Sequence, residues 1–337
     1  MTIREELERL EHRHLNPLAA FADESRGRLR PVEHLDTDVR TCYQRDVDRI
    51  VHSKAFRRLM HKTQVFLSPE GDHYRTRMTH TLEVARISRT IALALGLNVD
   101  LAEAIAMGHD LGHTPFGHAG EVALTECLGK PFRHNEQSLR VVDVLENGGQ
   151  GLNLTYEVRM GILGHTGEHI PETLEGQIVR RADRIAYINH DIDDACRAGI
   201  MCIEDIPIEI REVLGEKHGV RVNRMVSSVI EASADSAEIR MTPEVGEATA
   251  KLRKFLFDNV YYSPIAKAEE VKAMELLARL YEYFVRYPQK MPEVYRRNMA
   301  TDPVERCVCD FISSMTDRYA IDLYKDLFVP SVWRTPN

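Results

Sequence analysis

Apolar residues recur along most of this chain with the 3.6-residue period of an α-helix. The clearest case is the segment 77–95, which Gly96 ends. One face of this predicted helix carries His80, Val84, Ile87, Ile91 and Leu95. The same reasoning predicts further helices over residues 100–108, 136–145, 154–163, 176–195, 209–214, 222–234, 247–258, 266–287 and 304–327.

Strand signals are few. Residues 64–67 and 72–74 flank the turn sequence Pro69-Glu70-Gly71, and they predict at most a small β ribbon near 64–75. No internal repeat is visible, and the glycine-rich stretches at 147–151 and 215–219 indicate loops within one body. We therefore expect an all-α fold.

Composition narrows the functional classes. With 44 Lys+Arg against 52 Asp+Glu the formal net charge is −8, so duplex nucleic acid is not an expected partner. The basic residues nevertheless cluster ahead of residue 80. Such a cluster suits a small polyanion, although each member taken alone could belong to a solvated helix face. The cluster consists of Arg40, Arg45, Arg49, Lys54, Arg57, Arg58, Lys62, Arg75 and Arg77.

Cysteine usage and hydropathy indicate a location in the cytoplasm. None of the six cysteines has the paired spacing of a zinc site, so reduced thiols are expected. The charged start of the chain does not look like a signal peptide. No apolar run approaches the roughly 20 residues of a membrane span.

Candidate chemistry concentrates in residues 108–118, where His109, Asp110, His113 and His118 are interleaved with glycine, proline and apolar residues. Neutral imidazole and carboxylate are ligands that divalent transition metals prefer, and histidine also transfers protons near neutral pH. The apolar neighbours predict that this segment lies in a partly apolar pocket. The pattern favours a metal at the bottom of that pocket.

Two further polar residues lie on apolar helix faces. His80 follows the stripe of its predicted helix, and Asp183 shares a face with Val179 and Ala186. A buried carboxylate is costly unless a partner compensates its charge. A cation held jointly by His80, His109, Asp110 and Asp183 would offset these costs together.

This arrangement resembles the HD superfamily of metal-dependent phosphohydrolases. Longer strings are similar to the deoxyguanosine triphosphate triphosphohydrolase family, and the similarity spans roughly residues 38–200. The strings are AFRRL at 55–59, KTQV at 62–65, RTRMTHTLEVA at 75–85, HDLGHTPFGHAGE at 109–121, FRHNEQS at 132–138, ADRIAYINHD at 182–191 and a weaker MTDRYA at 315–320.

The resemblance implies an HD-domain helical core with additional C-terminal helices. We expect an N-terminal helical segment with the basic cluster over 1–60, the metal-binding catalytic core over 61–200, and a C-terminal helical region packed on the core over 201–337.

The resemblance also implies a reaction. Water attacks the α-phosphorus of a deoxynucleoside triphosphate, dGTP or several dNTPs, and releases deoxynucleoside and tripolyphosphate. His118 matches the family's catalytic histidine, and Glu121 would orient it and tune its proton affinity. The alternative is that His118 merely caps a helix opening at Ala119. Substrate contacts are predicted for Gln64, Lys62, Arg77, His113, His134, Arg184, Tyr187 and Asp191.

One divalent metal ion is expected, and the ligand set does not distinguish Mn, Mg, Fe, Co, Ni and Zn. HD phosphodiesterases place extra ligands where His134 and His165 stand, so a second ion is the alternative. We interpret His165 as a surface group or a support for a ligand. By resemblance the protein would form a tetramer or hexamer and could bind a second, activating dNTP.

Other functions stay open. An HD-type phosphodiesterase or nucleotide phosphatase would use the same metal ligands, and a deoxynucleotide sensor would use the same pocket without turnover. His118 and Glu121 argue against the sensor, because binding alone needs neither. The chain has neither a P-loop sequence nor a Gly-x-Ser-x-Gly elbow.

Overall fold

A computed structural model describes residues 1–32, 38–64, 75–260 and 264–330. The described parts are helical and contain no β-strand, which confirms the all-α prediction. Two isolated antiparallel bridges occur, between Arg28 and Thr155 and between Thr63 and Thr76. The predicted β ribbon falls mostly on residues 65–74, which lie outside the described residues.

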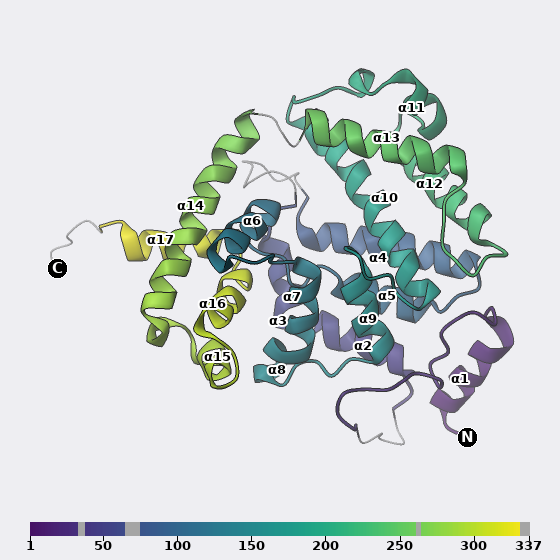
Figure 1. The fold of residues 1–337 in the computed structure, drawn as a ribbon. Coiled ribbons are helices and arrows are strands. Elements are labelled where there is room, and N and C mark those ends of the chain that lie inside the picture. The colour runs from purple at the N-terminus through teal and green to yellow at the C-terminus, as the bar shows by residue number, and fades with distance from the viewer. Residues whose placement is uncertain (33–37, 65–74, 261–263, 331–337) are drawn as a thin grey trace, which may run out of the picture.

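One long helix, α10 (Leu174–Arg197), contacts helices that precede it and helices that follow it in the chain (Figure 1). Three helices that precede it in the chain pack on it, α4 (Arg77–Ala94), α5 (Val99–Gly108) and α9 (Tyr156–Gly164), and α2 (Cys42–Val51) packs on α5. Shorter elements complete this part: α1 (Ile3–His14), α3 (Lys54–Arg58), α6 (Gly117–Leu128), α7 (His134–Arg140) and α8 (Glu146–Gly149).

The helices after α10 form two groups, which pack on different parts of the molecule. Two helices lie against α10, α12 (His218–Ser233) and α13 (Pro243–Asn259), and α11 (Ile208–Leu214) packs on both of them. The remaining ones gather around α6 at the other end of the molecule: α14 (Pro264–Arg286), α15 (Glu293–Arg296), α16 (Val304–Ser313) and α17 (Asp317–Phe328). The division of the chain into three domains stays a prediction.

Most predicted helices occur within a few residues of their expected bounds, but one prediction was wrong. The segment 304–327 forms two helices, because α16 ends at Ser313 and the Thr316 hydroxyl caps the start of α17 by accepting from the Tyr319 amide, at 3.2 Å. A hydrophobic period that continues across a cap cannot reveal such a break. The predicted helix over 136–145 consists of α7 and a π-helical turn, Val141–Leu145.

Three groups of buried apolar side chains hold these helices together. One lies between α2, α4, α5 and α9, a second between α10 and α11–α13, and a third between α6 and α14–α17. Burying a leucine- or phenylalanine-sized side chain contributes about 1.5–3 kcal/mol. Phe116, directly before α6, belongs to the third group, so the start of this helix is fixed by C-terminal packing.

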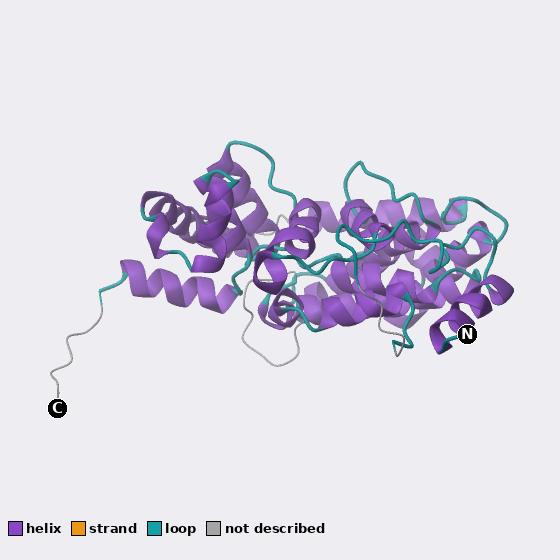
Figure 2. Cartoon of the chain, turned by 90° about the horizontal axis from the view of Figure 1, so that it is seen from below, coloured by secondary structure: helices purple, strands orange, loops and turns teal. Residues whose placement is uncertain are grey.

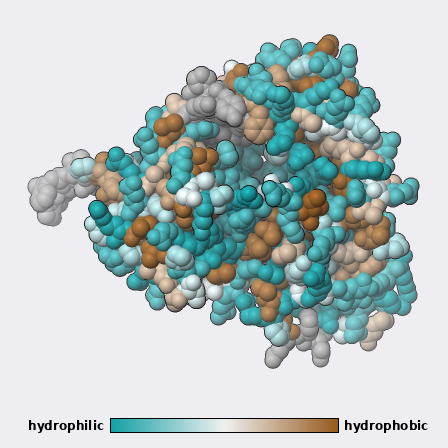
Figure 3. Space-filling model, viewed as in Figure 1, coloured by the Kyte–Doolittle hydropathy of each residue, from teal (hydrophilic) through white to brown (hydrophobic). Residues whose placement is uncertain are grey.

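Much of the outer surface is polar. The face shown in Figure 3 is mostly hydrophilic, with hydrophobic side chains scattered over it. Within the described residues, none of the helices combines the length and apolarity that crossing a membrane requires.

Candidate functional site

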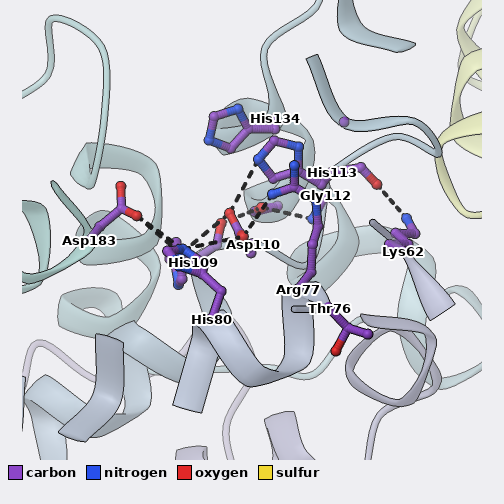
Figure 4. Close-up of polar contacts among 12 residues, drawn as sticks. Lys62, Thr76, Arg77, His80, His109, Asp110, Gly112, His113, His134 and Asp183 are labelled. Atoms are coloured by element: carbon purple, nitrogen blue, oxygen red, sulfur yellow. Dashed lines mark hydrogen bonds and ion pairs between the residues drawn. The ribbon is translucent and has the colours of Figure 1, made fainter. Parts of the chain in front are cut away.

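Four side chains from three separate segments meet beside α10 (Figure 4). His80 comes from the first turns of α4, His109 and Asp110 follow the last turn of α5, and Asp183 comes from α10. His80 Nε2 lies 3.1 Å from Asp183 Oδ1 and 3.8 Å from Asp110 Oδ2. His109 Nε2 lies 3.3 Å from Asp110 Oδ1 and 3.9 Å from Asp183 Oδ1. The structure therefore brings together the four residues predicted as metal ligands.

His109 is oriented for coordination. Its Nδ1 lies 2.7 Å from the carbonyl oxygen of Ala106, one turn earlier, and donates to it. The opposite nitrogen, Nε2, is thus left with a lone pair. This atom is buried and has no hydrogen-bond partner in the described structure. A buried acceptor without a donor is costly, and a cation satisfies it.

Asp110 carries a negative charge despite its burial. Burial alone would raise the pKa of its carboxyl, but His109 and His113 together with Arg77 hold it well below the ordinary value. Arg77 Nη1 donates to Asp110 Oδ2 at 3.0 Å. The pKa of Asp183 is likewise lowered, to about 2, because the hydrogen bond from His80 and the nearby His109 outweigh the effect of burial.

The residues present fit a divalent ion. Ligand atoms of His80, His109 and Asp110 all lie within 4.8 Å of one another, and the Asp183 carboxylate faces the same histidines. Two imidazoles and two carboxylates suit the borderline divalent metals.

A second group of histidines adjoins the first. Asp110, His113 and His134 also present ligand atoms within 4.8 Å of one another. His113 Nε2 is 3.3 Å from Asp110 Oδ1, and its ring stacks on His134 with centroids 3.9 Å apart. Burial, together with Arg77 and His134, holds the pKa of His113 well below its usual range, which favours neutral imidazole.

His165 is buried rather than a surface group, which corrects one half of its interpretation. Its Nδ1 donates to the Ile162 carbonyl at 2.7 Å, and its Nε2 lies 3.0 Å from His134 Nε2. Burial lowers the pKa of His165 to about 3. It supports the cluster, since its ring centroid is 5.0 Å from that of His109.

Glu121 joins His118 to this cluster. One carboxylate oxygen accepts from His134 Nδ1 at 2.7 Å and the other lies 3.5 Å from His118 Nδ1. The Glu121 carboxylate raises the pKa of His118, so that histidine keeps its proton to higher pH. The His118 side chain is 87% exposed.

A sharp turn with positive φ angles comes directly before α6 and sets the position of His118 at the start of that helix. Phe116 has φ of +63°, which is rare for a residue other than glycine, and Gly117 follows at +56°. The helix begins at Gly117, and no side chain caps it, so the alternative role of His118 as a helix cap finds no support. A Cβ atom at Gly117 would lie 3.1 Å from the Arg77 guanidinium, so the turn lies close against the arginine that pairs with Asp110.

Lys62 takes a position that its sequence did not indicate. The side chain is buried, and Nζ donates to the carbonyls of His113 and Ser313, the latter at 2.7 Å. Burial lowers its pKa to about 7. Two of its three donors are thus directed to the backbone, and its predicted phosphate contact stays a prediction.

The other predicted substrate residues line α10 and its surroundings. Tyr187 is half-buried and Asp191 is buried, one and two turns beyond Asp183. Arg184 lines a cavity of about 630 Å³ between α10 and α13, together with Arg181, Arg240 and Arg253. Gln64 is the last residue described before the gap at 65–74.

Sequence reasoning missed three residues near the site. Arg253 shares the cavity with Arg184, and its charge opposes the rise that burial causes in the pKa of Tyr187. The buried ring of His190 has its centroid 5.5 Å from that of His80, and its Nε2 contacts Glu83. Asp317 contacts the turn before α6. His190 and Asp317 left a signal, because they stand in the family-like strings ADRIAYINHD and MTDRYA, whereas Arg253 left none.

Comparison with protein families agrees with this geometry. Residues 77–188 match the HD domain, and residues 239–326 match the phosphohydrolase-associated domain. The all-α fold and the His/Asp cluster thus define an HD-domain phosphohydrolase.

Relatives narrow the assignment. Three relatives are named deoxyguanosinetriphosphate triphosphohydrolase-like proteins. The one from Caldanaerobacter subterraneus is 56% identical to this chain, over 100% of this chain and 99% of the relative. Those from Desulfatibacillum aliphaticivorans and Clostridium perfringens are 48% and 47% identical, over 98% of this chain in both cases and over 99% and 98% of the relatives. The chain belongs to this deoxyguanosinetriphosphate triphosphohydrolase-like family.

A solved structure shares the fold. The crystal structure of a phosphohydrolase from Bacteroides thetaiotaomicron superposes with a TM-score of 0.52 at 18% identity, covering 83% of this chain and 68% of the other.

Proposed function

We propose that this protein hydrolyses deoxynucleoside triphosphates, dGTP or several dNTPs, to deoxynucleoside and tripolyphosphate by attack of water at the α-phosphorus. The observation that carries the proposal is the meeting of His80, His109, Asp110 and Asp183, with His118 and Glu121 at the adjoining turn. The names of the relatives support a nucleotide substrate.

These four side chains would hold one divalent ion. When bound, the ion supplies positive charge that makes water a better nucleophile at neutral pH and stabilises the charge of the phosphate oxygens. The buried surroundings strengthen every charge interaction at this place. The remaining chemistry falls to the side chains of the chain itself.

His118 would act as the general acid. Attack at the α-phosphorus expels the 5′-oxygen of the deoxynucleoside, which needs a proton. Because Glu121 raises the pKa of His118, the imidazole keeps that proton to higher pH than an isolated histidine would. Glu121 in turn stays ionised, because His134 and His118 hold its pKa well below the ordinary value against the effect of burial.

Phosphate and sugar contacts would surround this centre. The planar guanidinium of Arg77, now paired with Asp110, suits phosphate oxygens, and Arg184 together with Lys62, His113 and His134 would complete the triphosphate contacts. Tyr187 would pack under the deoxyribose, where a 2′-hydroxyl would clash. Asp191 and Gln64 would bind the 3′-hydroxyl.

Product analysis tests this function. We expect purified protein with Mn²⁺ to convert a dNTP into deoxynucleoside and tripolyphosphate in equal amounts, as measured by ion-exchange chromatography. The four dNTPs are assayed singly and as mixtures, because a protein that needs an activating nucleotide is silent with a single substrate. Release of orthophosphate or pyrophosphate instead would contradict the proposal.

A phosphodiesterase or nucleotide phosphatase is the second candidate, and one observation favours it. Asp110, His113 and His134 present ligand atoms within 4.8 Å of one another beside the first cluster, so a second cation could be held there. Two metal equivalents per chain together with phosphodiester cleavage would support this candidate.

A basic cavity supports the proposal of a second, activating dNTP. It measures about 680 Å³, lies beside α3 and is lined in part by Lys62, whose amine donates to the His113 carbonyl. Its charged lining includes Arg30, Arg49, Lys54, Arg57 and Arg58. Part of the basic cluster noted in the sequence is thus directed into one cavity, which fits a triphosphate better than a solvated helix face.

Replacing Arg58 tests the activating site. We expect Arg58→Ala to weaken activation by a second dNTP by about 10-fold in the concentration needed, because one charge-assisted phosphate contact contributes about 1.5–3 kcal/mol. The measurement is the rate of hydrolysis of one labelled dNTP against the concentration of another. Unchanged activation in this variant would show that the activating dNTP does not bind in this cavity.

The family resemblance also leads us to propose a homo-oligomer, tetramer or hexamer, which sedimentation would measure.

A further inference from the structure

The turn that presents His118 is held in an unfavourable backbone conformation. Phe116 lies in the left-handed region with φ of +63°, where the side chain of any residue other than glycine is crowded against its own backbone. Within the turn, the Thr114 hydroxyl donates to the Gly117 carbonyl at 2.8 Å. Such a conformation persists only where its surroundings enforce it.

A carboxylate from the far end of the chain supplies that constraint. Asp317 Oδ1 accepts from the Phe116 amide at 3.0 Å. Its other oxygen, Oδ2, accepts from the amide of Thr63 at 3.0 Å and from the Thr63 hydroxyl at 2.6 Å. The side chain is buried, so all three hydrogen bonds are shielded from water.

Both partners precede residues assigned to the reaction. Phe116 lies two residues before His118, and Thr63 lies directly before Gln64. The Gln64 backbone also approaches the turn, since a Cβ at Gly117 would lie 3.6 Å from the Gln64 carbonyl oxygen. The carboxylate therefore fixes two active-site segments relative to each other.

Helix formation does not account for this placement. The cap of α17 is the Thr316 hydroxyl, which accepts from the Tyr319 amide, so Asp317 is not needed for that purpose. The break between α16 and α17 is what turns Asp317 toward the catalytic turn. Lys62 repeats the connection, because it joins the carbonyls of His113 and Ser313, one on each side of the same junction.

We infer that Asp317 is a positioning residue that holds the His118 turn and the Gln64 segment in register, and thereby makes hydrolysis depend on the C-terminal helices. This inference rests on the proposed function. Asp317 contacts backbone and a hydroxyl group, and its effect passes through His118 and Gln64.

Asp317→Asn tests the inference, because an amide has one acceptor oxygen where the carboxylate has two. We expect kcat to fall about 10- to 100-fold, since small displacements of a catalytic group have effects of this size. Metal content and circular dichroism should match the wild type. Asp322→Asn is the matched control, because Asp322 is an exposed carboxylate on the same helix, paired only on the surface with Arg318 and Lys325.

A double variant separates positioning from general destabilisation. If Asp317 acts mainly through His118, adding Asp317→Asn to His118→Ala should change kcat by no more than about twofold. Losses that multiply in full would overturn the inference, as would a wild-type kcat in Asp317→Asn. Asp317→Glu keeps the charge and should recover part of the rate.

Two further measurements keep the test decisive. Hydrogen exchange of the Phe116 amide should be at least about 10-fold faster in Asp317→Asn, while amides within α5 stay protected. This readout needs no turnover, so it still tests the contact if the protein fails to hydrolyse any dNTP and the proposed function falls. Should Asp317→Asn not fold, Thr63→Val removes a donor to the same carboxylate at similar volume. It should lower kcat in the same direction, and an unchanged kcat would contradict the inference.

Discussion

An Asp183→Ala variant should lose its bound divalent metal and lower the rate of dNTP hydrolysis by on the order of a thousandfold or more. Asp183 is the contribution of α10 to the cluster, and its carboxylate contacts both His80 and His109. Loss of that oxygen leaves two imidazoles and Asp110 as ligands. Metal per chain is measured by plasma mass spectrometry after dialysis, and the rate by chromatography of the deoxynucleoside.

Thermal unfolding gives a second readout that needs no substrate. Mn²⁺ at 100 times its Kd should stabilise the wild type by about 2.7 kcal/mol, because ligand binding to the folded state alone adds RT ln(1 + [L]/Kd). The Tm of Asp183→Ala should rise far less on the same addition. A variant that kept full metal content would show that the site does not depend on α10.

Asp191→Asn provides a matched control on the same helix. Burial and the neighbouring Asp194 raise the pKa of Asp191 well above its usual value, so its carboxyl is neutral over a wider pH range and an amide resembles it in shape and charge. This variant should keep the metal and its thermal shift. If Asp191 binds the 3′-hydroxyl, it should raise KM for the dNTP.

Replacing His118 by Ala should lower kcat by about 100- to 10,000-fold, the usual contribution of a general acid, while dNTP binding persists. The Glu121 carboxylate raises the pKa of His118. As pH rises through that pKa the acid form disappears, so the wild-type rate should fall on the alkaline side. In Glu121→Gln the supporting charge is gone, the pKa of His118 drops, and the alkaline fall should begin at lower pH.

Two outcomes would contradict these roles. Full activity in His118→Ala would remove the general acid from the mechanism. An alkaline limb that stays in place in Glu121→Gln would mean that another group sets it. Binding of a dNTP to His118→Ala, followed by calorimetry, distinguishes lost chemistry from a lost pocket, and turnover by the wild type excludes a protein that only senses deoxynucleotides.

The sequence predicted site residues best where a polar side chain that can bind a metal falls on the apolar face of a predicted helix. His80 and Asp183 stand on apolar faces of strongly periodic segments, so their burial and their direction toward a common centre could be inferred from local pattern. The break at 314–316 could not, because it depends on a single capping hydroxyl within a continuing apolar period.

Contacts between segments that lie far apart in the chain could not be predicted from the sequence. Lys62 was predicted to bind phosphate from its residue type and its place in the family-like KTQV string, and only the structure showed that its amine is directed to two backbone carbonyls. His165 was interpreted as a surface group or a support, and only packing showed its ring buried beside His109. Asp317 meets Thr63 and Phe116 across 254 and 201 residues.

The sequence by itself predicted the helical class and the metal-ligand candidates, because each depends on residue type and on a period within one element, and its family resemblance supplied His118 as the catalytic candidate. Only the tertiary structure decided which groups surround those residues. A hydrogen bond such as that from the Phe116 amide to Asp317 depends on how α6 and α17 pack, and no local pattern encodes that packing.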